Sequence, residues 1–338
     1  MASSSSTSRR VYAFDNPRSC SQLFNKLFEE HPQLLQIFHP LYPASSFGPE
    51  RIWLGLKHSD AAEEAQIRFA EGIQGPMFSR ETYAAACTRL DEKVEEVERQ
   101  GKVAWIKDHT ACCIRKEVIL RWLRQTSSLR AGENPTVFTE AFMDSLTPIL
   151  LIRHPALVIP SWYRKQKPLL RQAVHDEDFR VCTTLAWSRM VFDYYRYQAR
   201  QGHTNSTAAG DLHATEDGLP GTLIVVDAED ITHNTKPTME KLCSILHLDP
   251  QGVQYLWDPV PDEEIPDDPM RRAFFMDIMK STGVQQQAKN TAGQQLSLET
   301  EMAKWQVEFG EEDAAMLRAL VVAEMPNFEY LRQYKISV

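Results

Sequence analysis

Four short hydrophobic runs, each ending in polar residues, form the clearest pattern along the chain. They are Arg10–Asp15, Val103–Asp108, Thr147–Arg153 and Thr222–Asp227. Their apolar positions are nearly continuous rather than alternating, which is typical of strands that are buried on both faces, as in a parallel sheet. We therefore predict four parallel strands whose polar ends lie at one edge of a buried sheet.

A helical pattern follows each predicted strand, in Ser21–Glu30, Arg115–Ser127, Leu157–Tyr163 and Pro237–Leu248. Two further helical segments follow, near Met270–Ser281 and Ser297–Ala323. Strands that alternate with helices form βαβ crossovers, and the crossover helices cover both faces of the sheet. The pattern therefore predicts an α/β fold with a doubly wound parallel sheet.

The segments between these elements predict one domain with insertions. Residues 40–100 are rich in helix-forming residues, and Glu81–Arg99 has apolar side chains along one helical face. We expect this insertion to form a helical cap at the carboxyl edge of the sheet. Residues 198–221 are polar and rich in Gly, Thr and Ala, which predicts a flexible loop. Residues 1–9 are predicted to be a disordered tail, and residues 10–338 a single domain.

Composition and charge narrow the possible partners. The 338 residues are 43% hydrophobic and 25% charged, as in ordinary soluble domains, and the formal net charge is −9. This charge argues against a nucleic-acid-binding protein, whereas an anionic ligand requires only a few local cations and N–H groups. No apolar stretch reaches the ~18 residues that span a bilayer, and no secretory signal is recognisable. We expect a cytoplasmic protein with no membrane or nucleic-acid partner.

The cysteine pattern indicates neither a metal site nor a disulfide framework. The six cysteines are scattered and include no CxxC pair. We expect free thiols in a reducing compartment and no bound metal.

The segment from Asp15 to Gln22, DNPRSCSQ, connects the first predicted strand to the first helix. A helix N-terminus carries unpaired N–H groups and a partial positive charge, and Arg18 adds a full cation. Ser19 and Ser21 contribute hydroxyl groups. The G-x-x-x-x-G-K-[ST] pattern of ordinary triphosphate-binding loops is absent. The residues alone fit either an anion-binding loop or a capped turn with a surface Arg.

The same segment resembles the 5′-phosphosulfate-binding loop of sulfotransferases that use 3′-phosphoadenosine 5′-phosphosulfate (PAPS). That loop has the pattern Pro-(Lys/Arg)-Ser-Gly-(Ser/Thr)-(Thr/Ser). The matching residues are Pro17, Arg18, Ser19 and Ser21. Cys20 occupies the usual Gly position, and Gln22 occupies a position where a hydroxyl is usual. The resemblance implies that residues 17–22 bind the phosphosulfate.

The second strand ends in Lys107-Asp108-His109, which is similar to the Lys-x-His motif of sulfotransferases. The resemblance implies that His109 is the general base toward the acceptor hydroxyl. It also implies that Lys107 lies near the sulfuryl group and its leaving phosphate. A His side chain can accept a proton at neutral pH, and a Lys ammonium stabilises a developing anion. The residues alone leave two alternatives, namely Asp108 as the base or His109 as a helix cap.

The third strand is followed by Arg153, seven further residues and Ser161, with Tyr163 two positions later. This spacing resembles the 3′-phosphate-binding segment of the same family. A strand-end Arg can bind phosphate through its planar fork, and a Ser hydroxyl can complete the shell. Without the other two motifs, a salt-bridged Arg and an ordinary helix Ser would explain the segment equally well.

The resemblance covers residues 10–250 in scattered motifs. The family's C-terminal Arg-Lys-Gly signature is not recognisable, and Arg271, Arg272 and the turn at Lys280–Gly283 are candidate substitutes. Glu229 and Asp230 follow the fourth strand and are expected to be structural.

These motifs together predict a three-layer P-loop-type fold and a transferase. We expect a sulfotransferase that moves a sulfuryl group from PAPS, as co-substrate, to a hydroxyl of a small-molecule acceptor. Two alternatives remain open at the sequence level. One is the same fold used for another reaction, such as a kinase-like one, and the other is a non-catalytic nucleotide-binding or interaction protein. The acceptor and the oligomeric state are not encoded in any recognisable pattern.

Overall fold

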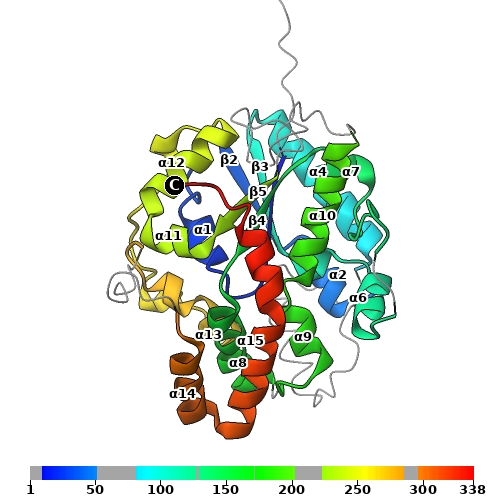
Figure 1. Ribbon diagram of the computed structural model, residues 1–338. Helices are drawn as coiled ribbons and strands as arrows, with labels where there is room; N and C mark the ends of the chain where they lie inside the picture. Colours follow the sequence, from blue (N-terminus) through cyan, green and yellow to red (C-terminus); the bar gives the residue numbers. More distant parts are fainter. Residues whose placement is uncertain (1–9, 52–80, 127–128, 171, 202–222, 285–295) are drawn as a thin grey trace, which may run out of the picture.

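The computed structural model describes residues 10–51, 81–126, 129–170, 172–201, 223–284 and 296–338. At its centre, a parallel sheet of five strands lies between two layers of helices (Figure 1). The strand order is β2 (Leu34–Phe38), β3 (Val103–His109), β1 (Arg10–Asp15), β4 (Leu146–Ile152) and β5 (Ile224–Asp227). The predicted three-layer α/β fold is confirmed.

Two hydrophobic cores fill the spaces between the sheet and the helix layers, because successive side chains of a strand point to opposite faces. Tyr12 and Phe14 of β1 point into one core, and Val11 and Ala13 point into the other. The first core is closed by α4 (Tyr83–Arg99), α5 (Thr110–Cys113), α6 (Lys116–Leu123) and α10 (Ala186–Arg200). The second is closed by α1 (Ser21–Lys26) and α12 (Thr235–Leu246).

A third, smaller core lies beyond the carboxyl ends of the strands (Figure 1). It is formed by the helices α8 (Pro155–Leu170), α9 (Glu177–Thr183), α14 (Leu298–Phe309) and α15 (Glu311–Arg332). The helix predicted for residues 297–323 is in fact two helices, because Gly310 between them takes a φ of 93° that side chains disfavour. After α15, Ile336 donates a backbone hydrogen bond to Val225, which fixes the end of the chain to β5.

The remaining elements connect these layers. They are α2 (Tyr42–Phe47), α7 (Glu140–Asp144), α11 (Ala228–His233), α13 (Pro269–Met279) and the 3₁₀ turns Pro250–Gly252 and Asp262–Glu264. No helix of the described segments is long and apolar enough to cross a membrane. All six cysteines are free, and four of them are buried.

Several elements were not predicted from the sequence, among them β2 and α10. The strand β2 was missed because only Leu34 and Ile37 of its five residues are buried, a pattern too short to distinguish from a loop. The helix α10 was also missed, although Trp187, Tyr194 and Tyr195 are buried as core residues. Of the predicted cap in residues 40–100, α4 packs on the face of the sheet and residues 52–80 lie outside the described residues.

The tail predicted for residues 1–9 also lies outside the described residues, as does the predicted loop beyond Gln201. Residues 198–200 form the last turn of α10.

The connections that leave β1 and β3 go to opposite faces of the sheet. β1 leads into α1 on one face, and its neighbour β3 leads into α5 and α6 on the other. Adjacent parallel strands with this arrangement leave a crevice at their carboxyl ends, where ligands of doubly wound proteins bind. The fold thus locates the candidate site beyond the ends of β1 and β3.

Candidate active site

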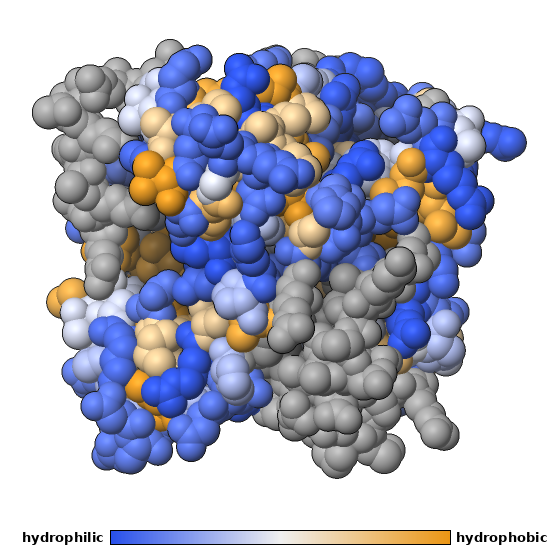
Figure 2. Space-filling view, turned by 90° about the horizontal axis from the view of Figure 1, so that it is seen from below, coloured by the Kyte–Doolittle hydropathy of each residue, from blue (hydrophilic) through white to orange (hydrophobic). Residues whose placement is uncertain are grey.

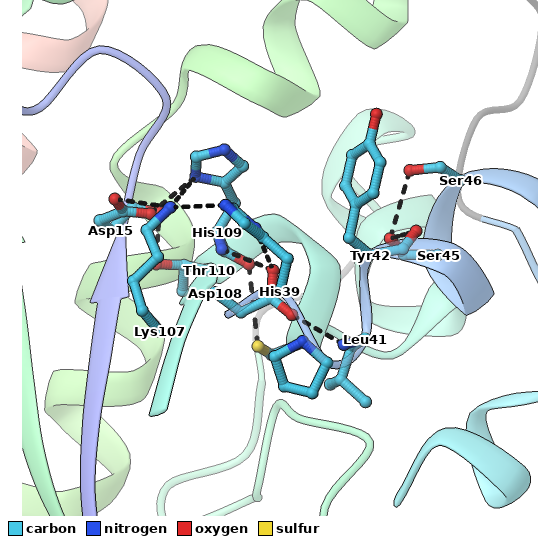
Figure 3. Close-up of polar contacts among 12 residues, drawn as sticks. Asp15, His39, Leu41, Tyr42, Ser45, Ser46, Lys107, Asp108, His109 and Thr110 are labelled. Atoms are coloured by element: carbon cyan, nitrogen blue, oxygen red, sulfur yellow. Dashed lines mark hydrogen bonds and ion pairs between the residues drawn. The ribbon is translucent and has the colours of Figure 1, made fainter. Parts of the chain in front are cut away.

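The register of the sheet brings distant polar residues together at the carboxyl edge. Asp15, the last residue of β1, pairs with His109, the last residue of β3, and Ala13 pairs with Lys107. On the other side of β3, Phe38 of β2 pairs with Lys107. Polar side chains at three strand ends therefore converge on one point (Figure 3).

His109 is oriented by Asp15. Its Nδ1 lies 2.7 Å from Oδ1 of Asp15, a fully buried carboxylate that can only accept a hydrogen bond. Nδ1 therefore donates, and Nε2 of the neutral ring is left with its lone pair. The side chain of His109 is 22% exposed, so the imidazole ring is accessible from solvent. The arrangement is that of a histidine held ready to accept a proton.

Asp15 stays ionised despite its burial. Burial acts to raise its pKa, but the charge of Lys107 and the hydrogen bond from His109 outweigh burial and lower the pKa to about 2. Sequence analysis did not single out Asp15, although it ends the first predicted strand and precedes the loop directly. Its partner in the sheet, which gives it its role, depends on long-range pairing.

Lys107 is the most buried cation of the site. Its side chain is 3% exposed, and Nζ forms an ion pair with Oδ2 of Asp15 at 3.2 Å. Nζ also lies 3.1 Å from Nε2 of His39 and 3.5 Å from Nδ1 of His109. Asp15 and His39 are thus the groups that pair with the buried ammonium, whose charge would be strongly unfavourable in the interior without a partner.

Asp108 is held entirely by the protein. Its fully buried carboxylate accepts hydrogen bonds from the backbone N–H groups of His109 and Leu41, both at 2.8 Å, and lies 3.2 Å from Nδ1 of His39. Both carboxylate oxygens are thus occupied, which leaves His109 as the better-placed base.

His39 is a second residue that sequence analysis missed. It follows β2 directly, has a φ of 48°, and donates a backbone hydrogen bond to Lys107 at 2.7 Å. Burial and the charge of Lys107 lower its pKa to about 4, so the ring is neutral at pH 7. Its signal in the sequence, a His after the run LLQIF, becomes visible only when that run is recognised as a strand.

The loop after β1 has two residues with a positive φ. Arg18 has a φ of 69° and Cys20 a φ of 66°, both in the left-handed region that favours glycine. Cys20 precedes α1 with no side-chain cap on the helix N-terminus. Pro17 and Ser21 are buried, and Gln22 is half-buried on the first turn of α1. The backbone path typical of a Gly is therefore formed by a Cys.

Arg153 and Ser161 meet this loop across the sheet edge. Nε of Arg18 donates to Oγ of Ser161 at 3.0 Å, and Nη1 of Arg153 donates to the carbonyl oxygen of Arg18 at 2.8 Å. Residues that are 143 and 135 positions apart are thus in direct contact. The structure brings together the two segments that the sequence assigned to the two phosphates.

Positive charge is concentrated here. Burial lowers the pKa of Arg18, and the nearby charges of Arg153 and Arg164 lower it further, while Asp277 opposes the shift. Arg164 is bound to Glu308, but neither Arg18 nor Arg153 forms an ion pair with a carboxylate of the described residues. The hydroxyl of Ser19 is fully buried and has no partner among these residues. Two guanidinium groups and a buried hydroxyl thus form a site suited to an oxyanion.

The candidates near the C-terminus lie on or beside α13. This helix packs against α1 and α8, where Phe274 contacts Trp162 with ring centroids 5.5 Å apart. Arg271 is half-buried on α13, whereas Arg272 binds Asp267 and Lys280 binds Asp262. Of these candidates, Arg271 is the one whose charge has no carboxylate partner among the described residues.

No group of three or more His, Cys, Asp or Glu side chains in the described segments could hold a metal ion. Hydrophilic residues predominate on the face to which the carboxyl ends of the strands point, with hydrophobic residues in small groups between them (Figure 2).

Comparison with known proteins supports this interpretation. No protein-family model matches the chain. It is 28% identical over 274 residues to the sulfotransferase ppzF of Metarhizium majus (strain ARSEF 297), and the match covers 76% of each chain. It is 27% identical over 281 residues to the sulfotransferase ppzF of Metarhizium rileyi (strain RCEF 4871), again with 76% coverage of each. With the parallel α/β fold, these distant similarities support membership of the chain in the sulfotransferase family of transferase enzymes.

Proposed function

We propose that this protein transfers the sulfuryl group of PAPS to a hydroxyl group of a small-molecule acceptor. The observation that carries this proposal is the position of two unlike groups of side chains on one short loop. Asp15 at its start holds the candidate base His109, and Arg18 three residues later joins Ser161 and Arg153. A proton acceptor thus adjoins an oxyanion site, as transfer between a hydroxyl and a phosphosulfate requires.

The donor is bound by the segments that carry unpaired positive charge. Arg18, the hydroxyls of Ser19 and Ser21, and the backbone N–H groups of residues 20–22 bind the 5′-phosphosulfate. Arg153 and Ser161 bind the 3′-phosphate, with the guanidinium as a fork and the hydroxyl beside it. Cys20 contributes its backbone N–H in the left-handed conformation.

His109 is the general base. Nε2 accepts the proton of the acceptor hydroxyl while the oxygen attacks sulfur, and Asp15 stabilises the imidazolium that forms. The bond between sulfur and the bridging phosphate oxygen breaks, and its electrons pass to the 5′-phosphate. Lys107 and Arg18 stabilise the negative charge that develops on this leaving group.

The decisive experiment separates donor binding from turnover. We expect His109→Ala to lower kcat by roughly 10²–10⁴-fold, because general-base catalysis contributes that much. Binding of 3′,5′-diphosphoadenosine, measured by calorimetry, should change less than about threefold, since His109 faces the acceptor. His175→Ala provides the control, because that side chain is 73% exposed and lies outside the site.

Lys107→Ala, assayed in parallel, is expected to lower kcat as well. If both variants kept full turnover, the assignment of the chemistry would be wrong. If the wild-type protein bound the nucleotide tightly and transferred no sulfuryl group to any hydroxyl acceptor, the protein would be a nucleotide-binding protein instead.

A further inference from the structure

The side chain of His39 has no place in the reaction proposed above, although it lies inside the catalytic cluster. Its ring centroid is 4.8 Å from that of His109, and its side chain is only 19% exposed (Figure 3). Three residues face it from neighbouring elements with titratable or charged groups: Lys107 and Asp108 on β3 and Tyr42 on α2. The ring of His109 packs against it as well.

The tautomer of His39 follows from its two partners. The carboxylate of Asp108 can only accept, so Nδ1 of His39 carries the hydrogen and donates to it across 3.2 Å. The ammonium of Lys107 can only donate, so Nε2 carries the lone pair and accepts from it across 3.1 Å. The neutral Nδ1–H form satisfies both contacts, and no other form does.

Lys107 depends on this lone pair for its direction. An ammonium group has three N–H bonds on a freely rotating stem. Asp15 attracts it as an ion pair at 3.2 Å, and His109 cannot accept from it because Nδ1 of that ring already donates to Asp15. His39 is thus the neutral acceptor that fixes the rotation of the ammonium and holds it on the β2 side of Asp15.

We propose that His39 is a positioning residue, which accepts a hydrogen bond from Lys107 and thereby directs the remaining N–H bonds of that ammonium toward the reacting group. Asp108 fixes the tautomer of His39 by accepting the hydrogen bond from its Nδ1. The cluster then contains two His–Asp pairs with different tasks. Asp15 prepares His109 to take a proton, and Asp108 prepares His39 to hold a lysine.

The inference rests on the proposed sulfuryl transfer for its catalytic consequence, and two amide substitutions test it. The amide of Gln reaches about as far as Nε2 of His, so His39→Gln retains an acceptor for Lys107. The amide of Asn reaches about as far as Nδ1, so His39→Asn retains the donor to Asp108 and loses the acceptor. We expect His39→Asn to lower kcat about tenfold to hundredfold and His39→Gln to retain most of it.

A double-mutant cycle distinguishes positioning from a general structural role. In a Lys107→Ala background, His39→Asn should lower kcat no further, because the residue through which it acts is gone. An equal loss in both backgrounds would overturn the proposal, and so would equal activity of the Asn and Gln variants. Calorimetry with 3′,5′-diphosphoadenosine should give an unchanged dissociation constant for His39→Asn.

A readout without turnover keeps this inference separate from the proposed function. The ¹⁵N chemical shifts of the His39 imidazole should show a protonated Nδ1 and an unprotonated Nε2 at pH 7 in the wild-type protein. The opposite tautomer, or an imidazolium, would overturn the positioning role even in an active enzyme. A protein with the expected tautomer and no sulfuryl transfer would instead refute the proposed function alone.

Discussion

The two halves of the candidate site differ in how far the protein satisfies its own charges. Beside β1 and β3, Asp15, Asp108 and Lys107 are almost fully buried, and each has a partner of opposite charge or a histidine. Beside β4 and α8, Arg18 and Arg153 have no carboxylate partner among the described residues, and the buried hydroxyl of Ser19 is unsatisfied. The charges of the first half are thus paired within the protein, whereas the two guanidinium groups of the second half face no carboxylate of the described residues.

This difference assigns a task to each half. Preorganised groups stabilise a transition state because they need no rearrangement when charge develops. Guanidinium groups without an ion pair bind a phosphate more favourably, because no internal ion pair has to be broken when the phosphate binds. Variants of the paired half should therefore affect catalysis and folding together, and variants of the unpaired half should mainly affect affinity.

The largest effect is expected from Asp15→Asn. This change leaves Lys107 buried at 3% exposure without its counter-charge and removes the group that orients His109. We expect kcat to fall roughly 10³–10⁴-fold, as when a triad Asp is replaced in other enzymes. The free energy of unfolding, measured with urea, should fall by about 3–5 kcal/mol.

A double variant shows which of these losses is electrostatic. Asp15→Asn with Lys107→Met removes both charges, so most of the stability should return while turnover stays low. If stability did not recover, packing around Asp15 rather than its charge would hold this edge of the sheet.

The next effect concerns acid. The pKa of His39 is about 4 in the folded protein, because burial and the charge of Lys107 disfavour the protonated ring. In the unfolded chain the pKa is the ordinary value of 6.5. Between these values the unfolded chain binds a proton that the folded protein does not, so stability falls as the pH falls from 6.5 to 4. The full contribution is about 3 kcal/mol. Urea unfolding at pH 7 and pH 4.5 should show a smaller decline for His39→Gln than for the wild type.

Asp15 acts in the same direction at lower pH. The pKa of Asp15 is about 2 in the folded protein and 3.8 in the unfolded chain. Its contribution to the free energy of unfolding is therefore present above pH 3.8 and is lost as the pH falls toward 2. An equal decline of the wild type and His39→Gln above pH 4.5 would therefore show that His39 is not held neutral.

The unpaired half is tested by Arg153→Ala. Charge-assisted hydrogen bonds contribute about 1.5–3 kcal/mol, so the dissociation constant of 3′,5′-diphosphoadenosine should rise roughly tenfold to hundredfold. The free energy of unfolding should change little, since Arg153 leaves no buried counter-charge behind. Arg115→Ala is the matched control, because that Arg binds Glu133 away from the site. A loss of stability without a loss of affinity would reverse the roles assigned to the two halves.

The sequence predicted the unpaired half better than the paired half, for a physical reason. A loop motif such as residues 16–22 is local. The strand before it was predicted with its observed bounds, and the helix after it begins at Ser21 as predicted but ends at Lys26 instead of Glu30. The spacing from Arg153 to Ser161 is local too. The paired half depends on register, because Asp15 meets His109 only through β1–β3 pairing.

His39 shows the same limit more strongly. It reaches Lys107 only because β2 pairs with β3, and β2 itself was missed as a short, half-buried edge strand. Pairing across a sheet is fixed by the packing of whole faces, which no short window of sequence contains. Residue types and motifs therefore predicted where an anion could bind, and the sheet was needed to identify what orients the base.

The smallest effect is expected at Cys20, which occupies the usual Gly position of the family pattern and has a left-handed backbone conformation. With a φ of 66° and a ψ of 17°, a residue with a Cβ is strained by about 1 kcal/mol, which Gly avoids. Cys20→Gly should therefore raise the free energy of unfolding by up to about 1 kcal/mol and leave the affinity for 3′,5′-diphosphoadenosine equal or tighter. Cys20→Val should lower both the free energy of unfolding and the affinity for this nucleotide, because a β-branched side chain disfavours the left-handed conformation further. If Cys20→Gly were less stable than the wild type, the Cys20 side chain would make a contact whose stabilisation exceeds the backbone strain. The loop would then have more internal contacts than the contrast between the two halves of the site implies.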